Sequence, residues 1–266
     1  MISTTQSKKI QNLILFIAGI LIIVILISII GLIKNNEVVF PKATTIMEAF
    51  FRLLSTGETY KYIGITILDF SIALLVSSIL GLGLGIIAGF NDVFLGIMKP
   101  LIMILRSLPM IILIVIFMLT VPNDNYRYVP IISTSLALMP ILYEAVSTGI
   151  RGIDRYYNDV WRLNSNLNAK VILNVHLPLI KGYLKQAFVN SIGFGIKMIV
   201  TTEFVAGVRN TLGTAIFNSK VLIEYADIYA YSLILIIIVL LFEMIPNLVL
   251  FIINKYKIKK NEEVKK

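Results

Sequence analysis

The chain of 266 residues contains no cysteine and only one histidine, His176. Without cysteine it cannot form a disulfide, a thiolate zinc site or an iron–sulfur cluster. A lone histidine also cannot supply the histidine pairs on which most zinc enzymes depend. We therefore expect no metal site and no other cofactor.

Charged residues are scarce too, at 15% of the chain, whereas hydrophobic residues make up 58% and mean hydropathy is +0.89. Soluble domains average about 25% charged and about 45–50% apolar residues. The composition excludes an ordinary soluble fold. It predicts an all-α integral membrane protein.

Six apolar runs are long enough to cross a hydrocarbon core about 30 Å thick. The first is too long for the apolar core of a signal peptide, so we interpret it as a retained helix. The third is interrupted by Arg106 and Pro109. The predicted transmembrane helices are residues 13–33, 63–90, 97–121, 128–150, 187–207 and 229–253.

The net charge of +9 is concentrated on one side of this arrangement. Lysine and arginine accumulate in short cytoplasmic loops, so we expect both termini in the cytoplasm. The basic rim then faces anionic lipid, and nucleic acid is not an expected partner. We divide the chain into residues 1–62 (tail, first helix and outer segment), a core of five helices over residues 63–255, and a basic cytoplasmic tail, 256–266.

The polar segment 151–186, between the fourth and fifth predicted helices, lies on this cytoplasmic side. Tyr157, Val160, Trp161 and Asn164 share one helical face, and a second short helix is expected over residues 168–176, ending before Pro178. Such a helix-turn-helix suits a groove on a partner protein. A helix on the lipid surface and a plain connector are the alternatives that the pattern leaves open.

The same segment carries a degenerate version of a longer motif. The full motif has a glutamate and two alanines, a glycine four residues on, and a leucine-proline about a dozen residues later. Aspartate, valine, tryptophan and serine stand here for glutamate, the two alanines and glycine. The chain resembles the permease subunits of bacterial ATP-binding-cassette (ABC) importers, in the nitrate, sulfonate and taurine branch. The matching residues are Asp159, Val160, Trp161, Arg162, Ser165, Leu177 and Pro178.

The resemblance continues along the chain in the family's order. It includes an outer segment at residues 39–58 and a glycine-rich second helix at residues 78–90. The other matching positions are Lys99 and Pro100, Leu105 to Pro109, Thr202 and Glu203, Gly207, Leu212 and Gly213.

This resemblance implies a MetI-like type I importer permease in the bacterial plasma membrane. Two permease copies would form the pathway as a homodimer, with two ATP-binding subunits in the cytoplasm and a substrate-binding lipoprotein outside. ATP hydrolysis would belong to those partner subunits, so the chain itself would not be an enzyme. The residues of the motif would contact the ATPase, and the cargo would be a small nitrate-, sulfonate- or taurine-like solute, or alternatively a thiamine-precursor-like pyrimidine.

Apart from Lys99 near the start of the third, six charged residues fall inside predicted helices, where each needs a partner or water. They are Asp69, Arg106, Glu144, Lys197, Glu203 and Glu243. Pairing within the bundle is one interpretation. Arg106, Glu144, Lys197 and Glu203 are also candidates for the pathway, where a cation would attract an anionic solute.

Two other classes of function remain open from the sequence. An ion-coupled secondary transporter would use Asp69, Glu144 and Glu203 as coupling groups, although no inverted repeat is evident. A structural or assembly protein would need no pathway.

Gly81, Gly85 and Gly89 recur every fourth residue in the second predicted helix. The chain has no phosphate-binding loop motif, so we interpret these glycines as a smooth surface for helix packing in lipid.

Overall fold

The computed structural model describes residues 39–154 and 168–263, and every regular element within them is helical. The chain divides into two compact units, one built from residues 1–57 and 216–234 and the other from residues 58–215 and 235–266. Helix α12, Tyr225–Glu263, belongs to both. The all-helical prediction is confirmed for the described residues.

The smaller unit combines helix α2, Ala43–Ser55, with the end of α11, Leu212–Val221, and the start of α12. Arg52 of α2 forms an ion pair with Asp227, which is buried in the first turn of α12. A carboxylate is favourable there because the helix dipole is positive at its N-terminus. The Tyr229 hydroxyl donates to the Val39 carbonyl at 3.4 Å, which fixes the residues before α2.

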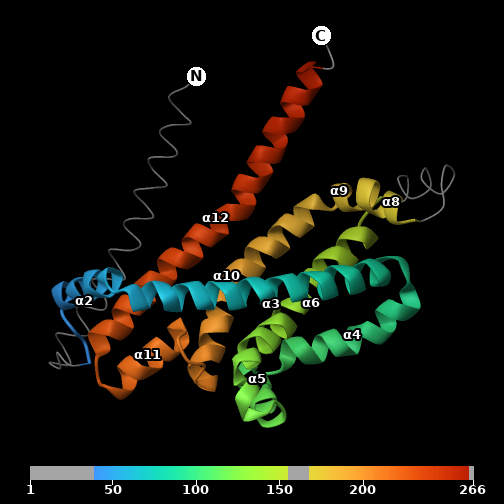
Figure 1. Ribbon diagram of the computed structural model, residues 1–266. Coiled ribbons are helices and arrows are strands. Elements are labelled where there is room, and N and C mark those ends of the chain that lie inside the picture. The colour runs from blue at the N-terminus through green and yellow to red at the C-terminus, as the bar shows by residue number, and fades with distance from the viewer. Residues whose placement is uncertain (1–38, 155–167, 264–266) are drawn as a thin grey trace. The chain divides into compact units, whose positions relative to one another are not determined.

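The larger unit is a bundle around α6 (Figure 1). The side chains of α6 are buried along most of its length. Helix α10 packs along α6. The elements of this unit that precede α11 are α3 (Gly57–Phe90), α4 (Asp92–Ser107), α5 (Met110–Thr120), the 3-10 helix η1 (Asn123–Tyr128), α6 (Val129–Arg151), α8 (Ala169–Val171), the π-helix η2 (Ile172–His176), α9 (Leu177–Leu179) and α10 (Lys181–Ala206).

Within the described residues, four helices are long and apolar enough to cross a membrane: Gly57–Phe90, Asn125–Arg151, Lys181–Ala206 and Tyr225–Pro246. They correspond to the second, fourth, fifth and sixth predicted crossings. Helices α4 and α5 together make a fifth candidate. The first predicted crossing, residues 13–33, lies outside the described residues, so the described part of the chain holds candidates for four or five of the six predicted crossings.

The third predicted crossing is not one helix. Helices α4 and α5 are bent by 98° relative to each other. The bend follows from Pro109, because a proline disfavours helical backbone in the residue before it, and Leu108 is extended, with φ −66° and ψ 126°. Residues 91–96, which lie between the second and third predicted helices, mostly belong to α4, whose start is capped by the Asn91 side chain.

Glycines let α3 approach α6 closely. A Cβ added at Gly85 would lie 2.8 Å from both the Tyr143 carbonyl oxygen and the Val146 Cβ. Gly81 and Gly89 meet Leu142 and Ile150 of α6 in the same way. The three glycines therefore form one line of close contact with α6.

Candidate functional site

The segment expected to contact an ATPase leaves the bundle at the end where α3 and α6 finish and α10 begins; we call this the loop end. Ile150 and Ile180 are buried there, and a Cβ at Gly149 would lie 3.1 Å from the Ile180 Cβ. The His176 ring is packed edge-on against Phe90, with ring centroids 4.8 Å apart. Residues on both sides of the segment are thus anchored to the ends of α3 and α6.

Arg151 connects the helices that meet at the loop end. Its Nε and Nη2 donate to the Ala88 carbonyl at 3.1 and 2.9 Å, and its Nη1 lies 2.7 Å from Asp92 Oδ1. Ala88 is in the last turn of α3, where helix carbonyls lack partners within the helix. One side chain therefore connects the ends of α3 and α6 with the start of α4.

Acidification should loosen this anchoring. Burial lowers the pKa of His176 below its ordinary value of 6.5, partly opposed by a hydrogen bond with the Val171 carbonyl. The neutral ring is therefore the form that stabilises the fold, and its contribution is complete above pH 6.5 and lost as the pH falls. The melting temperature of purified protein should drop more between pH 7.5 and pH 5 than that of His176→Asn. Equal drops would contradict this.

The proposed contact residues are only partly visible. Asp159, Val160, Trp161, Arg162 and Ser165 lie outside the described residues. Of the other two, Leu177 packs against the Ile150 and Ile180 cluster, and Pro178 is exposed.

The second short helix predicted for this segment is present, with Asn168 as its N-cap, but its predicted end is wrong. The helix continues through Pro178 to Leu179. The π-helical turn η2, in which the Leu177 N–H bonds to the Ile172 carbonyl, directly precedes Pro178.

Two of the candidate pathway residues pair with each other. Arg106 of α4 forms an ion pair with Glu144 of α6. Asp69 is similarly engaged, because Arg127 Nη2 lies 3.2 Å from its Oδ1. We did not predict the role of Arg127, which sits in η1 and is 58 positions from Asp69. Opposite charge was the only signal in the sequence that could have found it.

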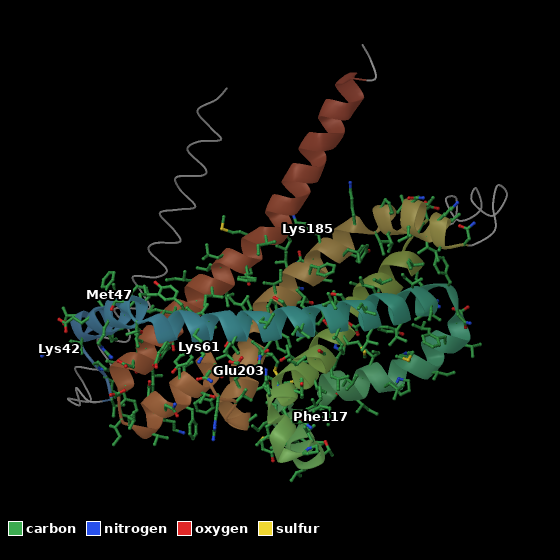
Figure 2. All side chains as sticks on the ribbon, in the orientation of Figure 1. Lys42, Met47, Lys61, Phe117, Lys185 and Glu203 are labelled. Atoms are coloured by element: carbon green, nitrogen blue, oxygen red, sulfur yellow. The ribbon has the colours of Figure 1, made fainter. Side chains whose placement is uncertain are left out.

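Glu203 is fully buried at the end of α10 opposite the loop end (Figure 2). Its Oε2 accepts hydrogen bonds from the Thr66 hydroxyl at 2.9 Å and the Gly213 N–H at 3.1 Å. Thr66 Oγ1 in turn accepts from the Leu212 N–H at 3.0 Å. Glu203 thus joins α10 to α3 and to the start of α11, and the pathway role expected for it stays a prediction.

Lys197 differs from the other candidates. It is exposed on α10, and no carboxylate oxygen lies within 4.0 Å of its ammonium among the described side chains of residues 39–122, 125–154 and 168–246. Glu243 of α12 comes near this face, because its Oε1 lies where a Cβ added at Gly193 would be.

The comparisons with known proteins agree on one family. Residues 81–258 match the family described as the binding-protein-dependent transport system inner membrane component. The chain is 30% identical over 152 residues to the putative aliphatic sulfonates transport permease protein SsuC of Bacillus subtilis strain 168. That alignment covers 56% of this chain and 54% of SsuC, so the chain spans about half the length of this relative.

Two solved structures share the fold. One is the crystal structure of a bacterial ABC transporter involved in the import of the acidic polysaccharide alginate, with a TM-score of 0.63 and 12% identity, covering 92% of this chain and 98% of that one. The other is the bacterial alginate ABC transporter in complex with a periplasmic protein bound to an alginate pentasaccharide, with a TM-score of 0.59 and 13% identity, covering 90% of this chain and 95% of that one.

These comparisons confirm the resemblance and the MetI-like permease fold that the sequence indicated. The family match covers well over half of the chain. The chain therefore belongs to the family of binding-protein-dependent transport system inner membrane components.

Proposed function

We propose that this chain is the transmembrane permease subunit of an ABC importer. The observation that carries the proposal is the family match over residues 81–258, which includes the whole segment expected to contact the ATPase. Two copies form the pathway in the bacterial plasma membrane, with both termini in the cytoplasm. Solute arrives on an outer binding lipoprotein, and two cytoplasmic ATPase subunits supply the energy.

The loop end suggests how force enters the bundle. Asp159, Val160, Trp161, Arg162 and Ser165 would dock on the ATPase, with Leu177 and Pro178 at the return to α10. Arg151 and the His176–Phe90 contact hold the two sides of this segment to α3, α4 and α6. A displacement of the docked segment would therefore move several helices together.

A small anionic organic solute, such as an aliphatic sulfonate, is the proposed cargo. The 30% identity to a putative sulfonate permease supports this choice. A thiamine-precursor-like pyrimidine has no comparable support.

The ion-coupled alternative is not favoured, because its three proposed coupling acids are occupied. Asp69 pairs with Arg127 and Glu144 with Arg106, while Glu203 accepts from Thr66 and Gly213. In this proposal the separate ATPase subunits hydrolyse ATP, and this chain catalyses no reaction of its own.

Substitution within the docking segment tests the proposal. We expect Trp161→Ala to reduce co-purification of the cognate ATPase roughly tenfold or more, because a buried aromatic anchor often contributes about 2 kcal/mol or more at an interface. Asp159→Lys should act in the same direction.

The matched control for both variants is Lys170→Ala, an exposed position in α8 outside the motif. It should leave recovery of the ATPase unchanged. Full recovery with both Trp161→Ala and Asp159→Lys would count against the docking assignment.

A further inference from the structure

Helix α10 carries a polar stripe, which we define as Gln186, Asn190, Lys197 and Thr201. All four are exposed, and their spacing of four, seven and four residues places them on one helical face. Gln186 Nε2 donates to Asn190 Oδ1 at 2.9 Å, and the Thr201 hydroxyl donates to the Lys197 carbonyl at 2.8 Å.

The stripe runs through the middle of a membrane crossing. At 1.5 Å per residue, the 26 residues of α10 extend about 39 Å, and Lys197 lies about 5 Å from the midpoint. A hydrocarbon core about 30 Å thick therefore includes its backbone. Charged residues at this depth face the interior of a bundle or a water-filled cavity, because exposure to acyl chains is costly.

Nothing in the described part of this chain neutralises Lys197. The three other candidate pathway residues have partners, as described above. Glu243 is the nearest rival, since its carboxylate lies over Gly193, one turn of α10 away, but no ion pair joins it to Lys197. Lys197 is thus a cation on an exposed polar face.

We propose that the polar stripe lines the translocation pathway and that Lys197 binds the anionic group of the passing solute, a sulfonate or similar small oxyanion. This rests on the proposed importer function. The ammonium can donate three hydrogen bonds, and the Asn190 amide nitrogen adds a neutral donor on the same face. A flexible lysine, which lacks the two-pronged geometry of arginine, suits a site that must also release its ligand.

The cysteine-free sequence permits a direct test in membranes holding the permease with its ATPase. Thr201→Cys should react with the anionic methanethiosulfonate ethylsulfonate faster than with its cationic trimethylammonium analogue. Adding Lys197→Gln should lower that ratio of rates about tenfold. By Coulomb's law, a unit charge about 6 Å away in water changes the reaction rate of each reagent roughly threefold, and by more where the polarity is lower. The two rates change in opposite directions, so their ratio changes about tenfold.

Ile79→Cys is the control for a surface facing lipid, because Ile79 is a 66% exposed apolar residue in the middle of α3. It should stay unmodified. Absence of reaction at Thr201→Cys, or a ratio unaffected by Lys197→Gln, would overturn the proposal whether or not the chain belongs to an importer.

Uptake of radiolabelled butanesulfonate into proteoliposomes gives a second measurement. Lys197→Gln should raise KM about tenfold or more, the effect of losing one hydrogen bond to a charged group, while Lys197→Arg retains most uptake. Glu243→Gln should be neutral.

Two outcomes of the uptake assay have separate meanings. Recovery of uptake in the Lys197→Gln, Glu243→Gln double variant would overturn the proposal, because Lys197 would then serve only to neutralise Glu243. Failure of the wild-type complex to show any ATP-dependent uptake would count against the importer function, while the cysteine reactions still decide the role of Lys197.

Discussion

Gly85→Val should prevent stable packing of α3 against α6. The Cβ alone would lie 2.8 Å from the Tyr143 carbonyl oxygen and from the Val146 Cβ, and valine adds two methyl groups beyond it. Overpacking a tight core costs about 1–3 kcal/mol, and the upper end applies here because a backbone atom cannot move aside as a side chain can. The melting temperature in detergent should fall by roughly 6–12 °C.

Gly83→Val is the matched control, since Gly83 lies two positions away on α3 and a Cβ there meets nothing within 4 Å. The two variants share the same change in helix propensity and hydrophobicity. Similar melting temperatures for both would show that the glycine contact with α6 contributes little to stability.

Glu203→Leu should lower stability by a similar amount. Leucine cannot accept the hydrogen bonds from the Thr66 hydroxyl and the Gly213 N–H, both of which are buried. A buried polar group without a partner costs about 1–3 kcal/mol, so we expect a loss of about 2–4 kcal/mol and a lower yield of folded protein from membranes. Thermal melting and size-exclusion profiles would measure it.

Glu203→Gln tests whether Glu203 is needed for its hydrogen bonds or for its acidity. The amide oxygen can still accept from Thr66 and Gly213, so stability should fall by less than about 1 kcal/mol and ATP-dependent uptake should persist. Loss of uptake with intact stability would instead indicate that proton exchange at this carboxyl is required, as the ion-coupled alternative supposes.

The sequence predicted crossings best where one apolar run forms one helix. Helices α3, α6, α10 and α12 coincide with predicted runs, although α10 begins at Lys181, six residues before the expected start, and α12 continues to Glu263. Polar residues at these ends are helical because a helix can extend beyond the lipid without changing its backbone bonding. Hydropathy marks the apolar part of such a helix and misses its polar ends.

Contacts between distant residues were harder to predict. Charge composition required partners for Asp69 and Glu144, but only the fold brings Arg127 and Arg106 to them. Likewise, Leu212 and Gly213 were noted only for their resemblance to a family, whereas their backbone N–H groups complete the Glu203 cluster. The ATPase contact at Asp159 to Ser165 stays a prediction.

The bend between α4 and α5 sets a requirement for the assembled transporter. At 1.5 Å per residue the two helices extend about 24 and 17 Å, so neither crosses a 30 Å core alone, and the elbow of a crossing made from both lies at membrane depth. Its backbone groups leave the helical ladder there, and acyl chains offer them no hydrogen bonds. Protein or water must therefore shield the elbow, so a solitary subunit in pure lipid would be an incomplete structure.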